Sequence, residues 1–560
     1  MSEAYGPLLN LNRIRPDLVT RVVDRSIQGF NESDLEHLLA EALFTEKSRL
    51  RRRDKGLTYL FTAQRRHRDL DLWRNVSGKL VKEPSGIETK DQVERVLRHY
   101  SEEIAGRFKP GVYEFATGAI PFGFRWLLNA LSVKNFIPWG MKASIEDRIQ
   151  IQGEVEQLQK LCKKGTVLLV PTHMSNIDSI LIGYVIYMMQ LPPFSYGAGL
   201  NLYSNPILSF FMSSLGAYTV DRKKQNRIYK ETLKNYSTEI LKEGIHSVFF
   251  PAGGRVRSGA IENHLKLGLL GTGIQAQIDN LIDRKPNPKI FVVPMVTSYH
   301  FVLEAIGLIE DYLLAEGQSR FLGADVQENP LLVNIGRFIW KFFSSETSVT
   351  VRIGKALDVF GNNVDEDGNS IGPSGQIVDQ IQLLKTQGEL KSVPQRDHEY
   401  TRHLGSVIAD RFYENNTVLS SHLVAFAYFR TLRERYPNYD LFRFLRLSSY
   451  QRQIPLRRFY EEADQLFQEV RAHADQGKLF LSPELRQSGT KKWVRDGVRN
   501  LGLLHDAAVV RIQNNTVNTD DMNLLYYYRN RLTGYGFSFK GSLGRPKILR
   551  GEPDEFGFLA

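Results

Sequence analysis

The chain has 560 residues, of which 42% are hydrophobic and 24% charged, and a formal net charge of +11. This length exceeds one ordinary core, so we expect two or three domains, and the composition excludes wholesale disorder. The positive charge favours an anionic partner, which could be nucleic acid, a phosphorylated metabolite or an anionic membrane surface.

No signal peptide or spanning helix is predicted. The N-terminus has no basic stretch followed by an apolar run. The most apolar stretches, 179–190 and 330–343, are shorter than the ~18 residues that a spanning helix needs. The single cysteine, Cys162, excludes an internal disulfide framework and a multi-cysteine metal site. We therefore expect any membrane contact to be peripheral.

Three regions differ in their patterning: a helical N-terminal region over 1–110, an α/β domain over 111–400 and a helical C-terminal domain over 401–560. In the first, a polar start at 31–33 precedes apolar residues at helical spacing: Leu35, Leu38, Leu39, Ala42 and Leu43. In the last, the clearest helices are expected at 418–436 and 522–532.

Short β-rich runs alternate with helical periods in the middle region. The candidate strands are 166–170, 217–220, 247–250, 290–293 and 348–353. A helix is expected over 229–240 with Gly244 as its stop, and 361–375 reads as a loop. This alternation predicts an α/β fold with a central mixed sheet flanked by helices.

The first of these strands runs directly into a segment that contains His173 and Asp178. Loops at the carboxyl ends of parallel strands line the ligand crevice of such sheets. A His there suits general-base work, and an Asp five residues later could orient the imidazole and stabilise its protonated form. The alternative is structural, because 175–178 also match a capping box in which Asp178 only caps a helix.

Two further strand ends carry positive charge. The strand at 247–250 leads into a glycine-rich loop with Arg255 and Arg257, and the strand at 217–220 leads into Asp221-Arg222-Lys223-Lys224. Glycines let backbone N–H groups approach an anion, and arginine forks match phosphate geometry. A tight turn with solvated arginines is the alternative. Together, the three strand ends predict a phosphate pocket beside a base.

These segments resemble the glycerolipid acyltransferase superfamily, and more closely its glycerol-3-phosphate acyltransferase branch. The superfamily has a His-x4-Asp block, a Gly-x4-(Asp/Arg)-Arg block, a glycine-rich arginine block and a Val/Ile-Pro strand block. The corresponding segments here, in the same order, are 173–178, 216–222, 253–259 and 293–299. Three segments resemble the branch in particular: 198–202, 253–268 and 525–530. The resemblance runs from about residue 90 to the end.

The resemblance implies that His173 is the base, that Asp178 is its partner, and that an acyl group passes from an acyl thioester to glycerol 3-phosphate. The implied phosphate-binding residues are Arg222, Arg255, Arg257, Ser258 and Lys266. It implies no metal, no cofactor and no covalent acyl-enzyme. The expected partners are acyl-CoA or acyl-carrier protein, glycerol 3-phosphate and an anionic membrane, at whose cytoplasmic face the protein would lie, and not nucleic acid.

The sequence departs from the family's pattern at two places. Many members have Glu where this chain has Ala252, and a Gly-x-Pro sequence where it has Gly354-Lys355-Ala356. Ala252 leaves open the same chemistry on lysophosphatidate or dihydroxyacetone phosphate, or a catalytically inactive lipid-binding relative. The tyrosines at 526–528 lie in a helical pattern that is typical of core packing.

Overall fold

The structure is a computed structural model. It describes residues 5–51, 57–80, 86–118, 148–200, 209–210, 212–318, 347–503 and 505–537. The apolar stretch 330–343 lies outside these residues.

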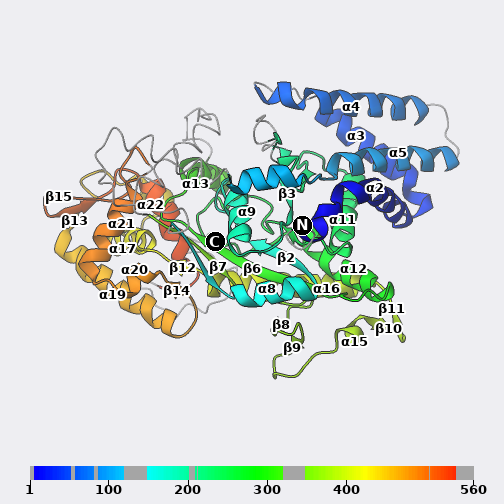
Figure 1. Ribbon diagram of the computed structural model, residues 1–560. Helices are drawn as coiled ribbons and strands as arrows, with labels where there is room; N and C mark the ends of the chain where they lie inside the picture. The colour runs from blue at the N-terminus through cyan, green and yellow to red at the C-terminus, as the bar shows by residue number, and fades with distance from the viewer. Residues whose placement is uncertain are drawn as a thin grey trace.

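A seven-stranded sheet forms the centre of the molecule (Figure 1), with the strand order β1-β7-β6-β2-β5-β3-β4. Strands β6, β2, β5, β3 and β4 are parallel, whereas β7 is antiparallel to β6 and carries β1 parallel to itself. The strands span Ile149–Gly153 (β1), Thr166–Pro171 (β2), Ser195–Gly199 (β3), Ala217–Val220 (β4), Ser247–Val248 (β5), Ile290–Ser298 (β6) and Val349–Ile353 (β7). The predicted mixed sheet flanked by helices is confirmed.

The five predicted strands correspond to β2, β4, β5, β6 and β7. Strand β5 ends two residues early, and β6 continues to Ser298 with every residue buried. Strands β1 and β3 were not predicted, because IQIQG and SYGAG lack the apolar runs by which the other strands were recognised. In β3, Gly197 leaves room for the Tyr218 ring, which would lie 3.1 Å from a Cβ at that position.

Helices α8, α11, α12 and α16 pack on the sheet. The predicted helix over 229–240 is α11, which is slightly longer, and Gly244 follows it with φ of +74°. The helices of this region are α8 (Val155–Lys164), α9 (Asp178–Met188), α11 (Arg227–Lys242), α12 (Leu267–Ile282), α13 (Ala305–Leu313) and the π-helical turn η4 (Leu314–Gln318).

The N-terminal region is helical, as predicted. It consists of η1 (Gly6–Asn10), α2 (Leu11–Gln28), η2 (Glu32–Asp34), α3 (Leu35–Arg51), α4 (Leu57–Leu80) and α5 (Gly86–Ile104). The apolar faces of these helices form one core with residues of α11 and β4, including Tyr218 and Tyr236. The N-terminal helices therefore lie against the β4 edge of the sheet, at the opposite end of the molecule from helices α17, α19 and α21 (Figure 1).

The C-terminal half shares its hydrophobic core with the sheet, so β6 and α17 belong to one continuous cluster. The expected helices at 418–436 and 522–532 are α17 and α22 with η5. Its helices are α15 (Gln380–Leu384), α16 (Pro394–Glu414), α17 (Ser420–Arg435), α18 (Leu441–Leu445), α19 (Leu456–Asp475), α20 (Pro483–Arg486), α21 (Thr490–Leu501), α22 (Met522–Arg529) and η5 (Asn530–Leu532).

Small sheets accompany these helices. Within the expected loop 361–375, β8 pairs with β9, and a three-stranded sheet joins β13, β16 and β15. The short strands are β8 (Asn363–Val364), β9 (Ser370–Ile371), β10 (Lys385–Thr386), β11 (Glu389–Leu390), β12 (Thr417–Val418), β13 (Ile454–Pro455), β14 (Phe480–Leu481), β15 (Arg511–Gln513) and β16 (Thr516–Asn518).

Among the helices of the described ranges, none combines the length and the apolarity required to cross a bilayer.

Gly259 is the point where the glycine-rich arginine loop meets the C-terminal region. Its φ is +81°, and an added Cβ would lie 2.2 Å from the Tyr527 carbonyl oxygen. We expect Gly259→Ala to lower the free energy of unfolding by about 3 kcal/mol or more, because backbone strain and a clash with main chain add. Gly375→Ala is the matched control, since Gly375 has φ of +82° and open space around it. Equal losses in urea unfolding would show that the contact with Tyr527 carries no energy.

Candidate active site

The predicted pair of His173 and Asp178 is in direct contact. His173 follows β2, Asp178 opens α9, and the His173 Nδ1 lies 2.9 Å from the Asp178 Oδ2. Both residues are buried, and Asp178 is fully inaccessible. With Nδ1 held by the carboxylate, Nε2 is the ring nitrogen that remains to exchange a proton with a substrate.

Asp178 also organises the loop that carries His173. Its Oδ2 accepts the backbone N–H groups of Met174 at 2.7 Å and Ser175 at 2.8 Å, and its Oδ1 accepts the Tyr299 hydroxyl at 2.5 Å. The bond from Ser175 is one half of the capping box considered from the sequence. Capping and orientation of the imidazole are therefore two roles of one carboxylate. Tyr299 comes from the end of β6, the next strand in the sheet.

Three contacts fix His173 from its other sides. The imidazole stacks on the Phe250 ring, with centroids 4.1 Å apart. Its backbone N–H donates to the Glu262 Oε1 at 2.7 Å, and its carbonyl accepts the Val256 N–H at 2.8 Å. The last bond ties the His173 loop directly to the arginine loop that follows β5.

Two basic side chains lie against Gly253 and Gly254 in this loop. A Cβ on Gly254 would lie 3.9 Å from the Arg222 Nη1, and a Cβ on Gly253 would lie 2.6 Å from the Lys266 side chain. Arg222 is exposed overall, yet partial desolvation and then the nearby charge of Arg255 lower its pKa. Like charges held this close favour an anion between them.

Glu304 joins the two loops electrostatically. Its carboxylate accepts the Ser175 hydroxyl at 2.8 Å and the Asn176 N–H at 3.0 Å, and it lies 3.4 Å from the Arg255 Nη1. Glu304 precedes α13. One carboxylate therefore sets the position of the Arg255 side chain relative to the His173 loop.

The two remaining predicted phosphate ligands lie differently. Arg257 is exposed, and within the described residues no contact connects its side chain to the other basic groups. Ser258 is buried, and its hydroxyl accepts the Ala260 N–H at 3.3 Å while its carbonyl accepts the Asn530 side-chain amide at 2.9 Å. The structure thus brings together His173, Asp178, Arg222, Arg255 and Lys266, whereas Ser258 connects the loop to η5.

The C-terminal segment 525–531 packs against the segments that carry the site. Arg531 is buried and donates to the Thr297 carbonyl at 2.9 Å, and its Nη1 lies 3.4 Å from the Met174 sulfur. The three tyrosines at 526–528 are buried, as the core-packing interpretation expects. The Tyr528 hydroxyl accepts the Val302 N–H at 3.0 Å.

Sequence reasoning did not assign roles to Phe250, Glu262, Tyr299, Glu304 or Arg531. Tyr299 stands at the end of the Val-Pro block, and Glu262 follows the apolar pair Ala260-Ile261, but neither pattern indicates the partner of the side chain. Position 252, an alanine here, has no carboxylate. Glu262 and Glu304 instead face the His173 backbone and Arg255.

Comparisons with known proteins place a family domain in this part of the chain. Residues 152–298 match the family model described as Acyltransferase. Proteins named glycerol-3-phosphate acyltransferase from Histophilus somni and Haemophilus influenzae (strain PittEE) are 35% identical over 151 residues and 31% identical over 175 residues. The Haemophilus ducreyi protein of that name is 27% identical over 217 residues.

These matches cover 27%, 31% and 38% of this chain, but only 18%, 20% and 23% of the relatives. The chain therefore spans about a fifth of the length of the curated relatives that it matches. The part that the family model matches, 152–298, contains strands β2 to β6 and the loops that follow β2, β4 and β5. The resemblance to the glycerolipid acyltransferase superfamily and its glycerol-3-phosphate branch is confirmed.

Burial raises the pKa of Glu262 from 4.5 to about 8, and the charge of Asp178 adds to this effect. Between these two pH values the folded protein keeps a proton that the unfolded chain has lost, so the free energy of unfolding falls as the pH rises. Because a glutamine cannot titrate, Glu262→Gln should remove this decrease in the free energy of unfolding, which is on the order of 2–4 kcal/mol across the pH window. Urea unfolding at several pH values measures it.

Glu389→Gln is the control, because Glu389 is exposed on β11. It should keep the pH dependence of the unaltered protein. If Glu262→Gln keeps it as well, Glu262 is not the group that titrates.

Proposed function

We propose that the protein transfers a fatty-acyl group from an acyl thioester to the hydroxyl of glycerol 3-phosphate, giving 1-acylglycerol 3-phosphate. The observation that carries the proposal is the His173–Asp178 pair at the same sheet edge as Arg222 and Arg255, with Glu304 joining the loop of the pair to Arg255. The names of the relatives support glycerol 3-phosphate as the acceptor, and the resemblance of the sequence motifs to the superfamily supports a thioester as the donor.

In the proposed reaction, His173 Nε2 removes the proton of the acceptor hydroxyl while its oxygen attacks the thioester carbonyl. The tetrahedral intermediate then collapses, the carbon–sulfur bond breaks, and the departing thiolate takes the proton from the imidazolium. Asp178 stabilises the imidazolium, and it is held in place by Tyr299 and by two backbone N–H groups. The reaction needs no covalent acyl-enzyme.

The phosphate of the acceptor would lie against Arg222, Arg255 and Lys266. Lys266 and Arg222 lie against Gly253 and Gly254, and Arg255 is near enough for its charge to affect Arg222. A cation cluster next to a base selects a small phosphorylated alcohol, since the phosphate fixes the hydroxyl within reach of Nε2. Arg257 remains a predicted ligand of the same phosphate.

We also propose that the protein works at an anionic membrane surface, at the cytoplasmic face, with acyl-CoA or acyl-carrier protein as donor. The net charge of +11 supports attraction to acidic lipids. Binding to vesicles of phosphatidylglycerol that falls with added salt, and weaker binding to neutral vesicles, would be the expected result.

His173→Ala should lower the rate of thioester turnover by roughly 10²–10⁴, because a general base contributes about this much. Asp178→Asn should lose activity as well. His264→Ala is the control, since His264 is exposed on the segment that follows the arginine loop. The measurement is the rate of turnover of a palmitoyl thioester by the purified proteins, with thermal unfolding as the check that each variant is folded. Full activity of His173→Ala would contradict the proposal.

The acceptor panel is glycerol 3-phosphate, dihydroxyacetone phosphate and lysophosphatidate. The proposal requires the largest kcat/KM for glycerol 3-phosphate. A preference for either other acceptor would keep the chemistry and overturn the substrate, and absence of turnover with all three would favour an inactive lipid-binding protein.

Arg255→Gln should raise the KM for glycerol 3-phosphate by roughly 10- to 100-fold, because a charge-assisted hydrogen bond to phosphate is lost. The KM for the acyl donor should stay unchanged. Arg257→Gln, two residues along, tests whether the exposed second arginine shares the phosphate. An effect of Arg255→Gln on the donor alone would contradict its assignment to the acceptor.

A further inference from the structure

A polar cleft, separate from the candidate active site, lies between the N-terminal helices and the edge strand β4. Its volume is about 550 Å³, which falls within the range of small-molecule sites. Charged side chains make up most of its wall. They are Arg15, Arg65, Arg68, Asp69, His99, Glu102, Glu103 and Arg107.

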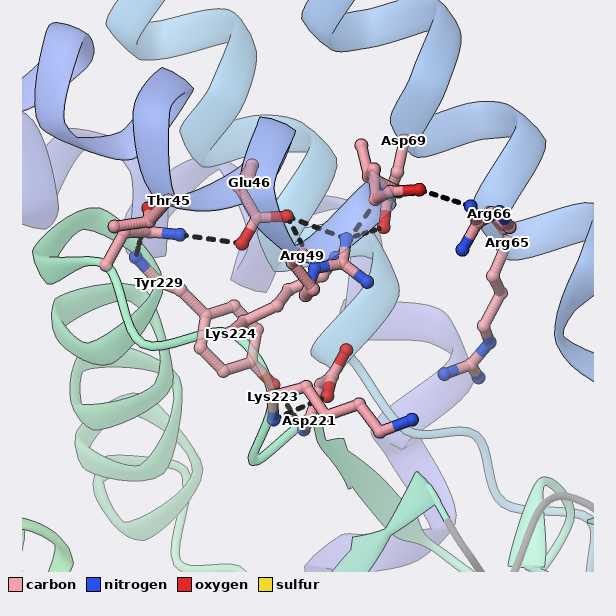
Figure 2. Close-up of polar contacts among 12 residues, drawn as sticks. Thr45, Glu46, Arg49, Arg65, Arg66, Asp69, Asp221, Lys223, Lys224 and Tyr229 are labelled. Carbon is pink, nitrogen blue, oxygen red and sulfur yellow. Dashed lines mark hydrogen bonds and ion pairs between the residues drawn. The ribbon is translucent and has the colours of Figure 1, made fainter. Parts of the chain in front are cut away.

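Two of the three carboxylates in this wall, those of Asp69 and Glu103, form ion pairs with cations outside the wall. The buried Lys224 Nζ lies 3.2 Å from the Asp69 Oδ1 and 2.5 Å from the Glu103 Oε2. Arg49 of α3, which also pairs with Glu46 at 2.6 Å, reaches Asp69 from the same side (Figure 2). Burial disfavours the charge of Lys224, but Glu103 and Asp69 keep its pKa above the ordinary value.

This pairing decides against a cation in the cleft. Asp69, His99 and Glu103 are near enough to one another to hold a metal ion. However, Lys224 already supplies a cation to both carboxylates, and His99 Nε2 lies 2.8 Å from Asp69. Burial opposes the charge of Asp69, yet His99, Lys224 and Arg49 hold its pKa well below the ordinary value. Asp69 and Glu103 are thus already paired with cations.

Among the residues that the structure describes, three of the arginines in the wall have no such ion pair. Within the described residues, Arg15, Arg68 and Arg107 form no ion pair with a carboxylate. Burial and then the charge of Arg107 lower the pKa of Arg15, with Tyr236 and Glu102 acting in the opposite direction, and the Arg15 Nε is buried without a hydrogen-bond partner. Its Nη2 donates to the Glu102 carbonyl, at 2.8 Å. Guanidinium groups without a carboxylate ion-pair partner, of which Arg15 and Arg107 repel each other, favour a bound polyanion.

The cleft lies next to the proposed acyl-transfer site. Ala217 and Thr219 of β4 line it, and β4 leads into the turn that carries both Arg222 and Lys224. Arg222 reaches Gly254 in the arginine loop, whereas Lys224 is buried against the N-terminal carboxylates. One turn therefore separates the acceptor's proposed phosphate site from the cleft.

We infer that this cleft is a second anion site, which binds phosphate groups that do not belong to the acceptor. The arginines fit phosphate monoesters and pyrophosphate. Such groups have two sources: the phosphorylated end of a nucleotide-like acyl carrier, or free inorganic phosphate and pyrophosphate. The assignment to the carrier rests on the proposed function, but the anion site itself does not.

The test is calorimetric binding of pyrophosphate and of adenosine 3′,5′-bisphosphate to the full chain. The double variant Arg15→Gln/Arg107→Gln should bind both probes roughly 10- to 100-fold more weakly, because two charged forks are removed. Arg13→Gln, an exposed arginine two residues from Arg15 on α2, is the matched control. Arg222→Gln should leave the binding of both probes intact. Thermal unfolding verifies that each variant is folded.

Steady-state kinetics then separate the two sources. If the KM for the acyl donor rises at least about tenfold in the double variant and the KM for the acceptor does not, the site holds the carrier's phosphates. If the probes lose affinity while both KM values stay unchanged, it holds free phosphate. The inference is overturned if the unaltered protein binds neither probe, or if Arg222→Gln abolishes binding and the double variant does not. Because binding is measured without turnover, its result stands even if no acyl transfer is found.

Discussion

The buried carboxylate of Asp178 is the group on which the geometry of the site depends. An inaccessible carboxylate is tolerable only when donors surround it, and here it accepts from His173, from two backbone N–H groups and from Tyr299. The same four contacts fold the loop, select the imidazole nitrogen that faces outward, and fasten the loop to β6. Loss of the carboxylate would affect all three at once.

A second carboxylate, that of Glu304, sets the distance between the proposed base and Arg255. It holds the His173 loop through Ser175 and Asn176 and holds Arg255 by charge. If Arg255 were free to move, the position of a bound phosphate relative to the base would vary, and rates of acyl transfer are sensitive to such errors. Position 252 offers only a methyl group, so the carboxylates of this site come from other segments.

Features encoded locally could be predicted from the sequence. His173, Asp178, Arg222 and Arg255 each follow a strand within a few residues, and parallel strands bring their carboxyl ends to one edge. Glu262, Tyr299, Glu304 and Arg531 could not be assigned in this way. Their roles depend on partners 89 to 357 residues away in the chain, and no periodicity encodes that pairing. Strand β3 was not predicted for a related reason. Its Gly197 makes room for the Tyr218 ring of the neighbouring strand, and a glycine of this kind does not contribute to a local strand pattern.

The reach of Arg531 across the chain has a consequence for synthesis. This side chain contacts Met174, 357 residues earlier, and the Tyr527 carbonyl closes on Gly259. Contacts of such sequence separation form late, because the entropy of closing the loop must be overcome before they contribute. A growing polypeptide on the ribosome would carry the His173 loop long before the residues that brace it have emerged. The proposed acyl-transfer centre would therefore mature only after residue 531 has emerged, so the nascent chain would have no finished site before that point.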